Sequence, residues 1–562
     1  MNVDEMQKKL SQKAAKEPEH PFENLYGLLC NKTWLRVAHH TVNTNAGRET
    51  AGIDGESMRN FNGDLEGNLE ALRQLLKAKS FEPQPVRRVY IPKPDGRKRP
   101  LGIPGIRDRI VQEALRMILE PIWEADFSVH SYGFRPNRNT YDAMAYLRNR
   151  LVGSAGKGYQ WVIEGDITSY FDTIPHRRLI KAIKKRVADR NTRDLIWKFL
   201  RAGVMYKGAL TETLTGTPQG GIISPLLANI YLHEMDKYME SNYLNISKLE
   251  RNKRRKAGKG NYLYTRYADD FVILCNGTKA EARQMKEEIG GLLRNMRLTL
   301  SEEKTQITHI TEGFTFLGYE IIKRTGIHGK MVPKVFVPKK AIKKFQDKLK
   351  AILAPVTRQE SLAAKIAAVN ALTRGWCNYY RNTSRPSQDF NQLRPKVFWG
   401  MAHWIGKKYK VNMPEVMRRY RKGDTLTTKT MTLVMPTEYK ARKLFTKHWH
   451  NPYTEKEKIV RERLFSLHNL WSGHEENRGW MDQREEVIRL KGTICALNLP
   501  DICESKGKPL HPSEVEIHHA TKPRAQFKDK TEADRMKHLQ PVCTSCHRAQ
   551  TKVDLKVLSR VR

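Results

Sequence analysis

Three aspartates in two short apolar stretches are the residues of this chain best suited to act together chemically. Asp166 follows the run WVIEG, and the neighbours Asp269 and Asp270 stand between TRYA and FVILC. An Asp-Asp pair followed at once by FVIL predicts the tip of a hairpin. Two Mg²⁺ ions held about 4 Å apart by such carboxylates assist phosphoryl transfer. The alternative is structural, because a single strand aspartate or an Asp-Asp turn often binds nothing.

The elements around these acids alternate between strand and helix patterns. The strand-like runs are RRVYIP, YQWVIEGDI and DFVILC, and the helical ones include RIVQEALRMILEPIW and SPLLANIYLHEMDKYMES. Residues 1–80 show helical spacing of leucines, and a basic helical pattern returns from about residue 340. The chain therefore predicts a mixed α/β region between two helical ones.

Positive charge dominates the composition. The 562 residues include 101 Lys and Arg against 60 Asp and Glu, so the formal net charge is +41. A polyanion is the economical partner, because each neutralised phosphate releases counterions. One basic run, RNKRRKAGKG at 251–260, lacks apolar periodicity. It predicts a solvated loop, with phosphate contact as the alternative.

The apolar and cysteine content indicates an intracellular protein with one local metal site. No apolar run approaches the roughly twenty residues that span a bilayer, and the N-terminus does not resemble a signal peptide. We expect a cytoplasmic protein with no membrane partner. Four of the seven cysteines crowd the last segment, which favours a metal site over a disulfide framework; they are Cys495, Cys503, Cys543 and Cys546.

The motifs around the acids, taken in order through residues 81–320, resemble the reverse transcriptases of group II introns. This resemblance implies that Lys93 and Arg99 meet the triphosphate of an incoming dNTP and that Lys304 lies near it. It also places Phe171 under the sugar, where the ring would exclude a 2′-hydroxyl, and Gln219 of GTPQGG close to template or nucleotide. The structural alternatives are a charged β-hairpin for Lys93 and Arg99, a core position for Phe171, a flexible turn for the motif with Gln219 and an exposed strand end for Lys304.

The resemblance continues beyond the polymerase motifs. FTFLGYEI resembles the primer-grip hairpin, although core packing alone explains its apolar positions. GWCNYYRN resembles the thumb, or maturase X, domain of intron-encoded proteins. There we expect Trp376, Tyr379 and Tyr380 to be packing residues.

The last segment resembles the HNH, or ββα-metal, endonuclease of mobile introns. The resemblance implies that Cys543 and Cys546 supply one half of a zinc site and that Cys495 with Cys503 would supply the other half, although seven residues separate this second pair. The resemblance makes His519 the base that activates water. His518 and His547 would hold one divalent ion.

Two features of this segment depart from the endonuclease pattern. Pro500 stands at the expected partner position, three residues before Cys503, and His538 replaces the asparagine of the motif unless that asparagine has moved. The alternative is a zinc-stabilised knuckle that binds DNA without cutting it.

Together these readings predict a multidomain protein with α/β and α parts, built as a right-hand polymerase of fingers, palm and helical thumb with a small ββα-metal domain. The expected order is a helical RNA-binding extension at 1–80, fingers and palm at 81–330, the thumb at 331–424, a basic DNA-binding region at 425–485 and the HNH-like domain at 486–562.

The expected function is that of an RNA-directed DNA polymerase that assists splicing of its group II intron and cleaves target DNA for intron mobility. Its cofactors would be two Mg²⁺ ions in the polymerase site, structural Zn²⁺ and one divalent ion in the nuclease site. Its partners would be intron RNA, target DNA and dNTPs, with nucleoid association during mobility. The alternatives are a splicing cofactor without catalysis, a maturase whose tail only binds DNA, and a reverse transcriptase of another bacterial lineage.

Overall fold

The chain folds into two compact units, Met1–Thr454 and Glu455–Arg562, and each is described by itself. The structure is a computed structural model. It describes residues 2–92, 96, 98–152, 158–206, 209–211, 215–217, 220–326, 329, 331–444, 449–455, 503, 515–519, 539–543 and 546. No helix within these ranges is both long and apolar enough to cross a membrane.

Five helices form the N-terminal extension, which confirms the helical prediction for residues 1–80. They are α1 (Val3–Lys16), α2 (Tyr26–Leu29), α3 (Lys32–Asn43), α4 (Met58–Gly63) and α5 (Leu65–Lys77). The side chains that cap four of them accept backbone N–H bonds from the first turn; they belong to Asn2, Asn31, Ser57 and Asp64. The extension packs on α6 (Ile106–Asp126), where Trp34 Nε1 donates to the carbonyl of Ala114 at 3.0 Å.

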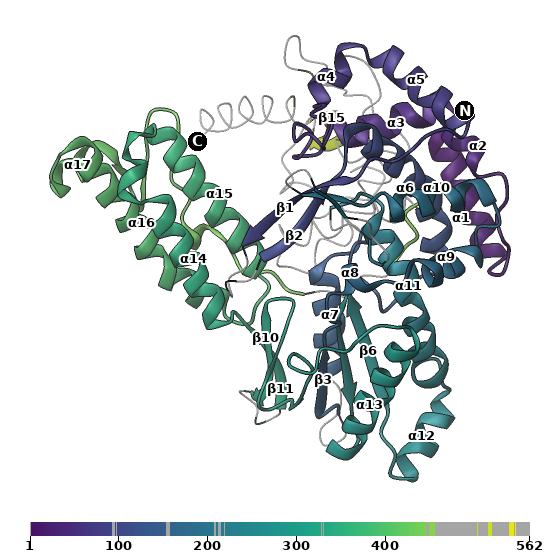
Figure 1. The fold of residues 1–562 in the computed structure, drawn as a ribbon. Helices are drawn as coiled ribbons and strands as arrows, with labels where there is room; N and C mark the ends of the chain where they lie inside the picture. Colours follow the sequence, from purple (N-terminus) through teal and green to yellow (C-terminus); the bar gives the residue numbers. More distant parts are fainter. Residues whose placement is uncertain are drawn as a thin grey trace. The chain divides into compact units, whose positions relative to one another are not determined.

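A small sheet with strand order β2-β1-β4-β5 forms the predicted fingers (Figure 1). Its strands are β1 (Val86–Pro92), β2 (Lys98–Ile103), β4 (Val204–Tyr206) and β5 (Ala209–Thr211). β1 and β2 pair antiparallel, with Arg99 opposite Ile91. β1 and β4 run parallel, so the hairpin of β1 and β2 is tied to a segment more than a hundred residues later.

A second sheet, with strand order β6-β7-β3-β8, is named here the palm sheet. Its strands are β3 (Trp161–Gly165), β6 (Tyr262–Tyr267), β7 (Asp270–Cys275) and β8 (Gln306–His309), and every pairing is antiparallel. Alternate residues enter two different cores, as the two-residue period of a strand requires. Ile163 and Ile273 join the core that includes α11 (Ser224–Met239) and α13 (Lys279–Asn295), whereas Val162 and Val272 join the core that includes α7 (Thr140–Leu151).

The helices α8 (Tyr170–Thr173), α9 (His176–Lys184), α10 (Arg190–Arg201) and α12 (Lys248–Lys256) complete this part of the fold. The prediction of a loop at 251–260 was wrong for 251–256, because α12 runs through Lys256, whereas 257–260 form the turn and loop after it. Ser247 caps its start, and Gly258 ends it with a positive φ of 70°. Lys and Arg are good helix formers, so the missing apolar period indicates a helix without a buried face.

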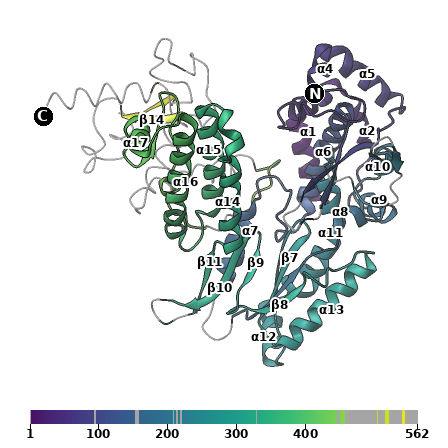
Figure 2. The same cartoon turned by 60° about the vertical axis from the view of Figure 1, so that its left-hand side comes forward.

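A three-stranded sheet and four helices follow the palm (Figure 2). The strands are β9 (Phe314–Phe316), β10 (Tyr319–Thr325) and β11 (Met331–Phe336), and the helices are α14 (Lys339–Ile352), α15 (Leu362–Tyr380), α16 (Pro386–Tyr409) and α17 (Met413–Tyr420). The core of this predicted thumb continues past residue 424. β12 (Arg421–Lys422) pairs with β13 (Thr425–Leu426), and Leu433 and Met435 are buried in the same core.

The segment after the thumb returns to the N-terminal half of the first unit. Asn451 accepts a hydrogen bond from Ser11 at 3.2 Å, and the hydroxyl of Tyr453 bonds to Glu120. In the second unit, β14 (Val515–His519) pairs antiparallel with β15 (Leu539–Cys543).

Candidate active site at the end of the palm sheet

The register of the palm sheet brings the three predicted aspartates to one end of it. β3 runs antiparallel to β7 with Gly165 opposite Phe271, so Asp166 follows β3 beside Asp270. In the hairpin of β6 and β7, Tyr267 pairs with Asp270, which leaves Ala268 and Asp269 as the turn. The predicted hairpin tip is therefore confirmed.

The acids and two basic side chains form one electrostatic cluster. Lys304 Nζ lies 2.7 Å from Asp166 Oδ2. Desolvation and then the charges of Asp269 and Asp166 raise the pKa of Asp270 to about 7, although its side chain still reaches solvent. Desolvation and Asp166 also raise the pKa of Asp269, while Lys304 and Arg99 act against this rise. Sequence reasoning thus named five residues that the fold does bring together.

The donor set of this cluster fits Mg²⁺, but only as an incomplete site. In the described ranges, no group of three or more His, Cys, Asp or Glu side chains already has the geometry of a metal site. Three carboxylates nevertheless share this end of the sheet, and Lys304 forms an ion pair with only one of them, Asp166. Mg²⁺ in proteins takes one or two carboxylates and completes its shell with water and substrate phosphates. Asp166, Asp269 and Asp270 are thus suitable ligands once a nucleotide is present.

A buried ion pair supports the turn that carries Asp269. Arg266 Nη2 donates to Asp236 Oδ2 at 2.6 Å, and both side chains are 0% exposed. Arg266 Nη1 donates to the carbonyl of Ala268 and to Asn229 Oδ1, each at 2.9 Å. Asp236 also accepts a 2.8 Å bond from the hydroxyl of Tyr264. Burial opposes ionisation of Asp236, but the charge and hydrogen bonds of Arg266 hold its pKa well below the ordinary value.

The segment around Gly133 braces the same turn from the other side. Asn229 Nδ2 donates to the carbonyl of Gly133 at 2.8 Å. A Cβ on Gly133 would lie 2.4 Å from the backbone nitrogen of Ala268, so only glycine allows this approach. Backbone bonds of 2.9 Å link Arg266 to His130 and to Tyr132.

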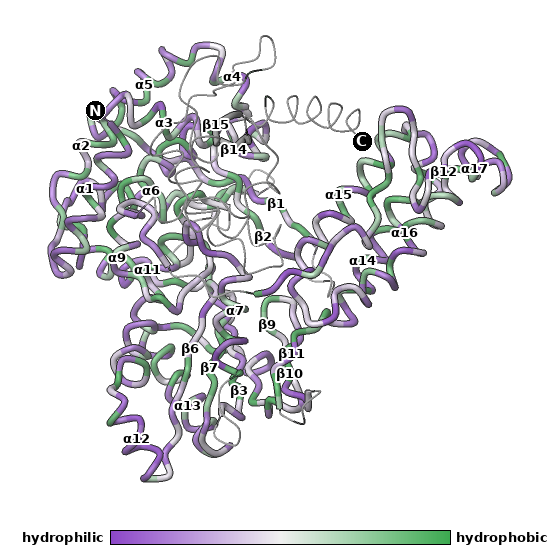
Figure 3. The backbone as a smooth tube through the Cα atoms, turned by 180° about the vertical axis from the view of Figure 1, so that it is seen from behind, coloured by the Kyte–Doolittle hydropathy of each residue, from purple (hydrophilic) through white to green (hydrophobic). Residues whose placement is uncertain are grey.

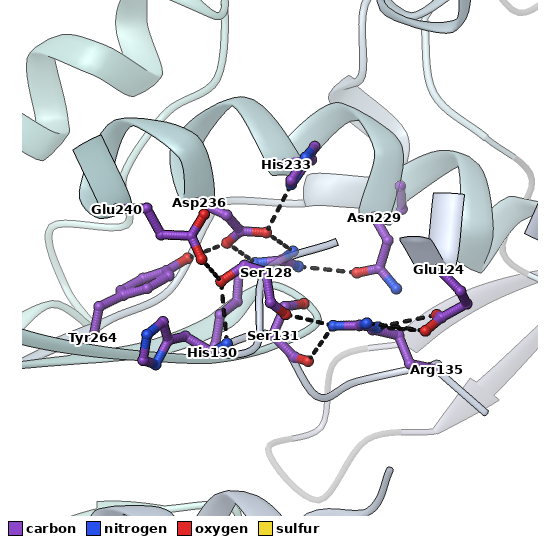
Figure 4. Close-up of polar contacts among 12 residues, drawn as sticks. Glu124, Ser128, His130, Ser131, Arg135, Asn229, His233, Asp236, Glu240 and Tyr264 are labelled. Carbon is purple, nitrogen blue, oxygen red and sulfur yellow. Dashed lines mark hydrogen bonds and ion pairs between the residues drawn. The ribbon is translucent and has the colours of Figure 1, made fainter. Parts of the chain in front are cut away.

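A second buried ion pair fixes this bracing segment. Arg135 pairs with Glu124 at 2.9 Å and donates to the carbonyl of Ser131, also at 2.9 Å (Figure 4). Sequence reasoning missed both networks. The sequence did offer a signal for the first network. Asn229 and Asp236 are polar residues in a largely apolar helix, and because they lie seven positions apart they share one face of α11.

Only some of the residues predicted to contact the nucleotide lie within the described ranges. Phe171 in α8 is half-buried, and its ring meets that of Phe134 edge-on with centroids 6.2 Å apart. Lys93 and Gln219 lie outside the described residues. Gly220, the neighbour of Gln219, has φ of 114°, and a Cβ there would lie 2.3 Å from the carbonyl oxygen of Gly102 in β2. The glycine motif therefore lies directly against the fingers hairpin.

Two tyrosines of α15 hold the hairpin predicted to be the primer grip. Tyr379 donates to the carbonyl of Leu317 at 2.6 Å, and Tyr380 donates to that of Gly318 at 3.2 Å. The rings of Tyr319 and Tyr379 stack with centroids 5.0 Å apart, and the ring of Trp376 packs on Tyr380 at 4.8 Å. The packing role expected of the GWCNYY motif is confirmed, with hydrogen bonds that sequence reasoning did not foresee.

The described part of the tail consists of β14, β15 and two buried cysteines. His518 lies opposite Gln540 and His519 opposite Leu539, and Val515 lies opposite Cys543. Cys503 and Cys546 are buried. The side chains of His518, His519 and Cys543 are outside the described residues, as are Cys495, His547, Pro500 and His538 entirely.

Two stretches of the chain match known protein families. Residues 91–321 match the family described as "Reverse transcriptase (RNA-dependent DNA polymerase)". Residues 342–422 match the family described as "Group II intron, maturase-specific domain". The first stretch contains the acidic cluster, and the second covers most of the thumb helices.

Individual proteins show the same likeness over longer ranges. The chain is 39% identical over 370 residues to protein YkfC of Escherichia coli (strain K12), which covers 63% of this chain and 97% of that protein. It is 32% identical over 488 residues to the group II intron-encoded protein LtrA of Lactococcus lactis subsp. cremoris, which covers 74% of this chain and 80% of that protein. It is 27% identical over 282 residues to nuclear intron maturase 2, mitochondrial, of Arabidopsis thaliana, which covers 39% of this chain and 38% of that protein.

Proposed function

Since the chain belongs to the family of group II intron-encoded proteins and is thus a reverse transcriptase and splicing maturase, we propose that the acidic cluster of the palm sheet is its polymerase centre. Asp166, Asp269 and Asp270 would hold two Mg²⁺ ions. When bound, these ions lower the charge barrier between a primer 3′-hydroxyl and the α-phosphate of a dNTP. The convergence of the three acids with Lys304 and Arg99 is the observation that carries this proposal.

The basic side chains of the centre have separate tasks. Arg99 lies on the fingers strand β2 and is exposed, so its planar guanidinium is free to bind a triphosphate through two parallel hydrogen bonds. Lys304 is bound to Asp166 and is half exposed. It would move from the carboxylate to a phosphate when the ligand shell is complete. Lys93, from the same hairpin as Arg99, would add a mobile charge.

The remaining nucleotide residues would set specificity. Phe171 would lie under the sugar and exclude a 2′-hydroxyl, which selects dNTPs over rNTPs. Gln219 would lie against the template or nucleotide, since its neighbour Gly220 already approaches β2.

An exchange of a single ligand atom tests the centre. Asp166→Asn keeps the shape of the side chain but removes its charge, and we expect at least a hundredfold loss of primer extension on an RNA template. Asp194→Asn, at an exposed position of α10, is the matched control and should extend primers normally. Normal extension by Asp166→Asn would refute the assignment.

For the tail we propose a second activity, the nicking of target DNA. His519 would activate water, His518 and His547 would hold one divalent ion, and the four cysteines would hold Zn²⁺. The motif supports this assignment, together with the pairing of the strand that carries both histidines with the strand that ends at Cys543. Nicking and reverse transcription by one protein would insert the intron into target DNA, with nucleoid association during that process. A tail that only binds DNA is the competing function.

A further inference from the structure

The helix α12 carries a dense positive charge and buries none of its residues. Its nine residues include one acid, Glu250, and six cations, and Lys259 follows in the next turn; the six are Lys248, Arg251, Lys253, Arg254, Arg255 and Lys256. Figure 3 shows most of the helix in the hydrophilic colour. Leu249, its one large apolar side chain, is 65% exposed.

Repulsion within α12 opposes its own folding. Arg251 and Arg255 are four residues apart and Lys253 and Lys256 are three apart, so like charges are neighbours on the helix surface. The helix dipole favours a basic last turn, but it does not remove this repulsion. In the part of the chain that the structure describes, no carboxylate forms an ion pair with Lys248, Lys253 or Lys256. Anions from outside would therefore stabilise the helix.

The protein holds this helix in a fixed position despite the repulsion. Arg251 Nη2 donates to the carbonyl of Leu244 at 2.6 Å, and Asn261 Nδ2 donates to the carbonyl of Arg251 at 3.2 Å. The guanidinium of Arg254 lies 5.1 Å from the ring centre of Tyr243. The middle and the last turn of α12 are thus tied to neighbouring residues, as a preformed binding surface requires.

The position of α12 separates it from the polymerase centre. β6 begins at Tyr262, just after α12, and the turn with Asp269 follows the other end of that strand. Six strand residues span about 20 Å. Figure 1 shows α12 beside the lower end of the palm sheet, away from the fingers hairpin. A nucleic acid bound to α12 therefore occupies a different place from the primer end.

We propose that α12 is a docking site for folded intron RNA, separate from the site that holds template and primer. The inference rests on the maturase function and adds the surface through which the protein holds its intron. The cations of α12 lie on opposite sides of the helix. This arrangement suits a ligand that presents phosphates to two sides of the helix. Folded RNA does so where two of its backbones lie close together. A membrane surface fits poorly, because an interfacial helix needs an apolar face.

Removal of three unpaired charges tests this site. The variant carries Lys248→Gln, Lys253→Gln and Lys256→Gln, because Gln retains helix propensity. The matched control carries three Lys→Gln changes at exposed positions of α9 and α11; they are Lys181, Lys184 and Lys237. Both variants are titrated with folded group II intron RNA that encloses this reading frame, with poly(U) and with duplex DNA, over a range of salt.

We expect the α12 variant to bind intron RNA about tenfold or more weakly at 0.15 M salt. The slope of log affinity against log salt concentration should decrease in magnitude by about 2, since each lost phosphate contact removes about 0.7 to 0.9 from that slope. Extension of a short DNA primer on an RNA oligonucleotide should stay at the wild-type rate. The control should keep most of the RNA affinity.

Several results would overturn the proposal. Equal loss in the α12 and control variants would show a general charge effect, and a larger loss on duplex DNA would assign the helix to DNA. Parallel loss of primer extension would place α12 in the template path. Failure of the wild-type protein to extend primers would count against the polymerase centre alone, because intron RNA binding is measured separately.

Discussion

Arg266 Nη1 donates a 2.9 Å hydrogen bond to the carbonyl oxygen of Ala268, the residue directly before Asp269. The same guanidinium is fixed by Asp236 on α11, so a wholly buried ion pair sets the position of the turn that carries two of the three acids. Catalytic carboxylates must be held within a fraction of an ångström of their working positions. The structure achieves this with a charged pair under the turn and with glycine at position 133 beside it.

Arg266→Lys should slow the chemical step while primer–template binding remains intact. Lysine keeps the charge but lacks the fork that reaches Asp236 and Ala268 together. We expect kcat for dNTP incorporation to fall about tenfold or more, a higher Mg²⁺ requirement and an unchanged Kd for primer–template. The measurement is single-turnover incorporation over a Mg²⁺ titration. A protein that melts earlier but keeps its kcat and Mg²⁺ requirement would show that Arg266 only stabilises the fold.

Local patterns predicted the palm hairpin and the acids well, because strand alternation and the Asp-Asp turn are encoded within a few neighbouring residues. They did not predict the partner of Arg266, because Asp236 lies thirty residues earlier on a different element. The loop prediction at 251–260 failed over 251–256 for a related reason. Apolar periodicity reports which face is buried, and α12 has no buried face.

Phe171→Ala should weaken discrimination between dNTP and rNTP. Removal of the ring that we propose lies under the sugar should raise the ratio of kcat/KM for rNTP over dNTP by about tenfold or more. Phe171→Tyr keeps the ring and serves as the control, with a ratio near wild type. If both variants keep the wild-type ratio, Phe171 is a core residue, which its half-buried contact with Phe134 would explain equally well.

His130 should make the protein less stable as pH falls below about 6.5. Burial lowers the pKa of its imidazole to about 4, so the folded protein keeps it neutral while the unfolded chain takes up a proton. The unfolded state then binds more protons, and the unfolding free energy falls by up to about 1.4 kcal/mol per pH unit between pH 6.5 and 4. His130→Phe should remove this part of the slope in urea unfolding at pH 7, 6 and 5. An unchanged slope would contradict the assignment.

His519→Ala should stop the nicking of a DNA target that pairs with the intron RNA, while reverse transcription continues. The imidazole and the palm acids belong to separate compact units, so each activity should fail alone. Cys543→Ser should act through folding instead, because the Zn²⁺ that we propose there would contribute directly to folding free energy. Strand cleavage and primer extension are assayed side by side on the same preparations. If the wild-type protein with its intron RNA never nicks such a target, the tail binds DNA without cutting it.

The most direct test of the polymerase centre is single-turnover primer extension on an RNA template by Asp269→Asn and Asp270→Asn, with intron RNA affinity measured in parallel. Each change removes one proposed metal ligand, whereas RNA affinity depends on dispersed Lys and Arg contacts with phosphate. We predict that both variants lose at least about a thousandfold in extension rate, an effect of about 4 kcal/mol on the barrier, and bind RNA within about twofold of wild type. DNA synthesis at a near-wild-type rate by either variant would contradict the assignment of the catalytic centre to the end of the palm sheet.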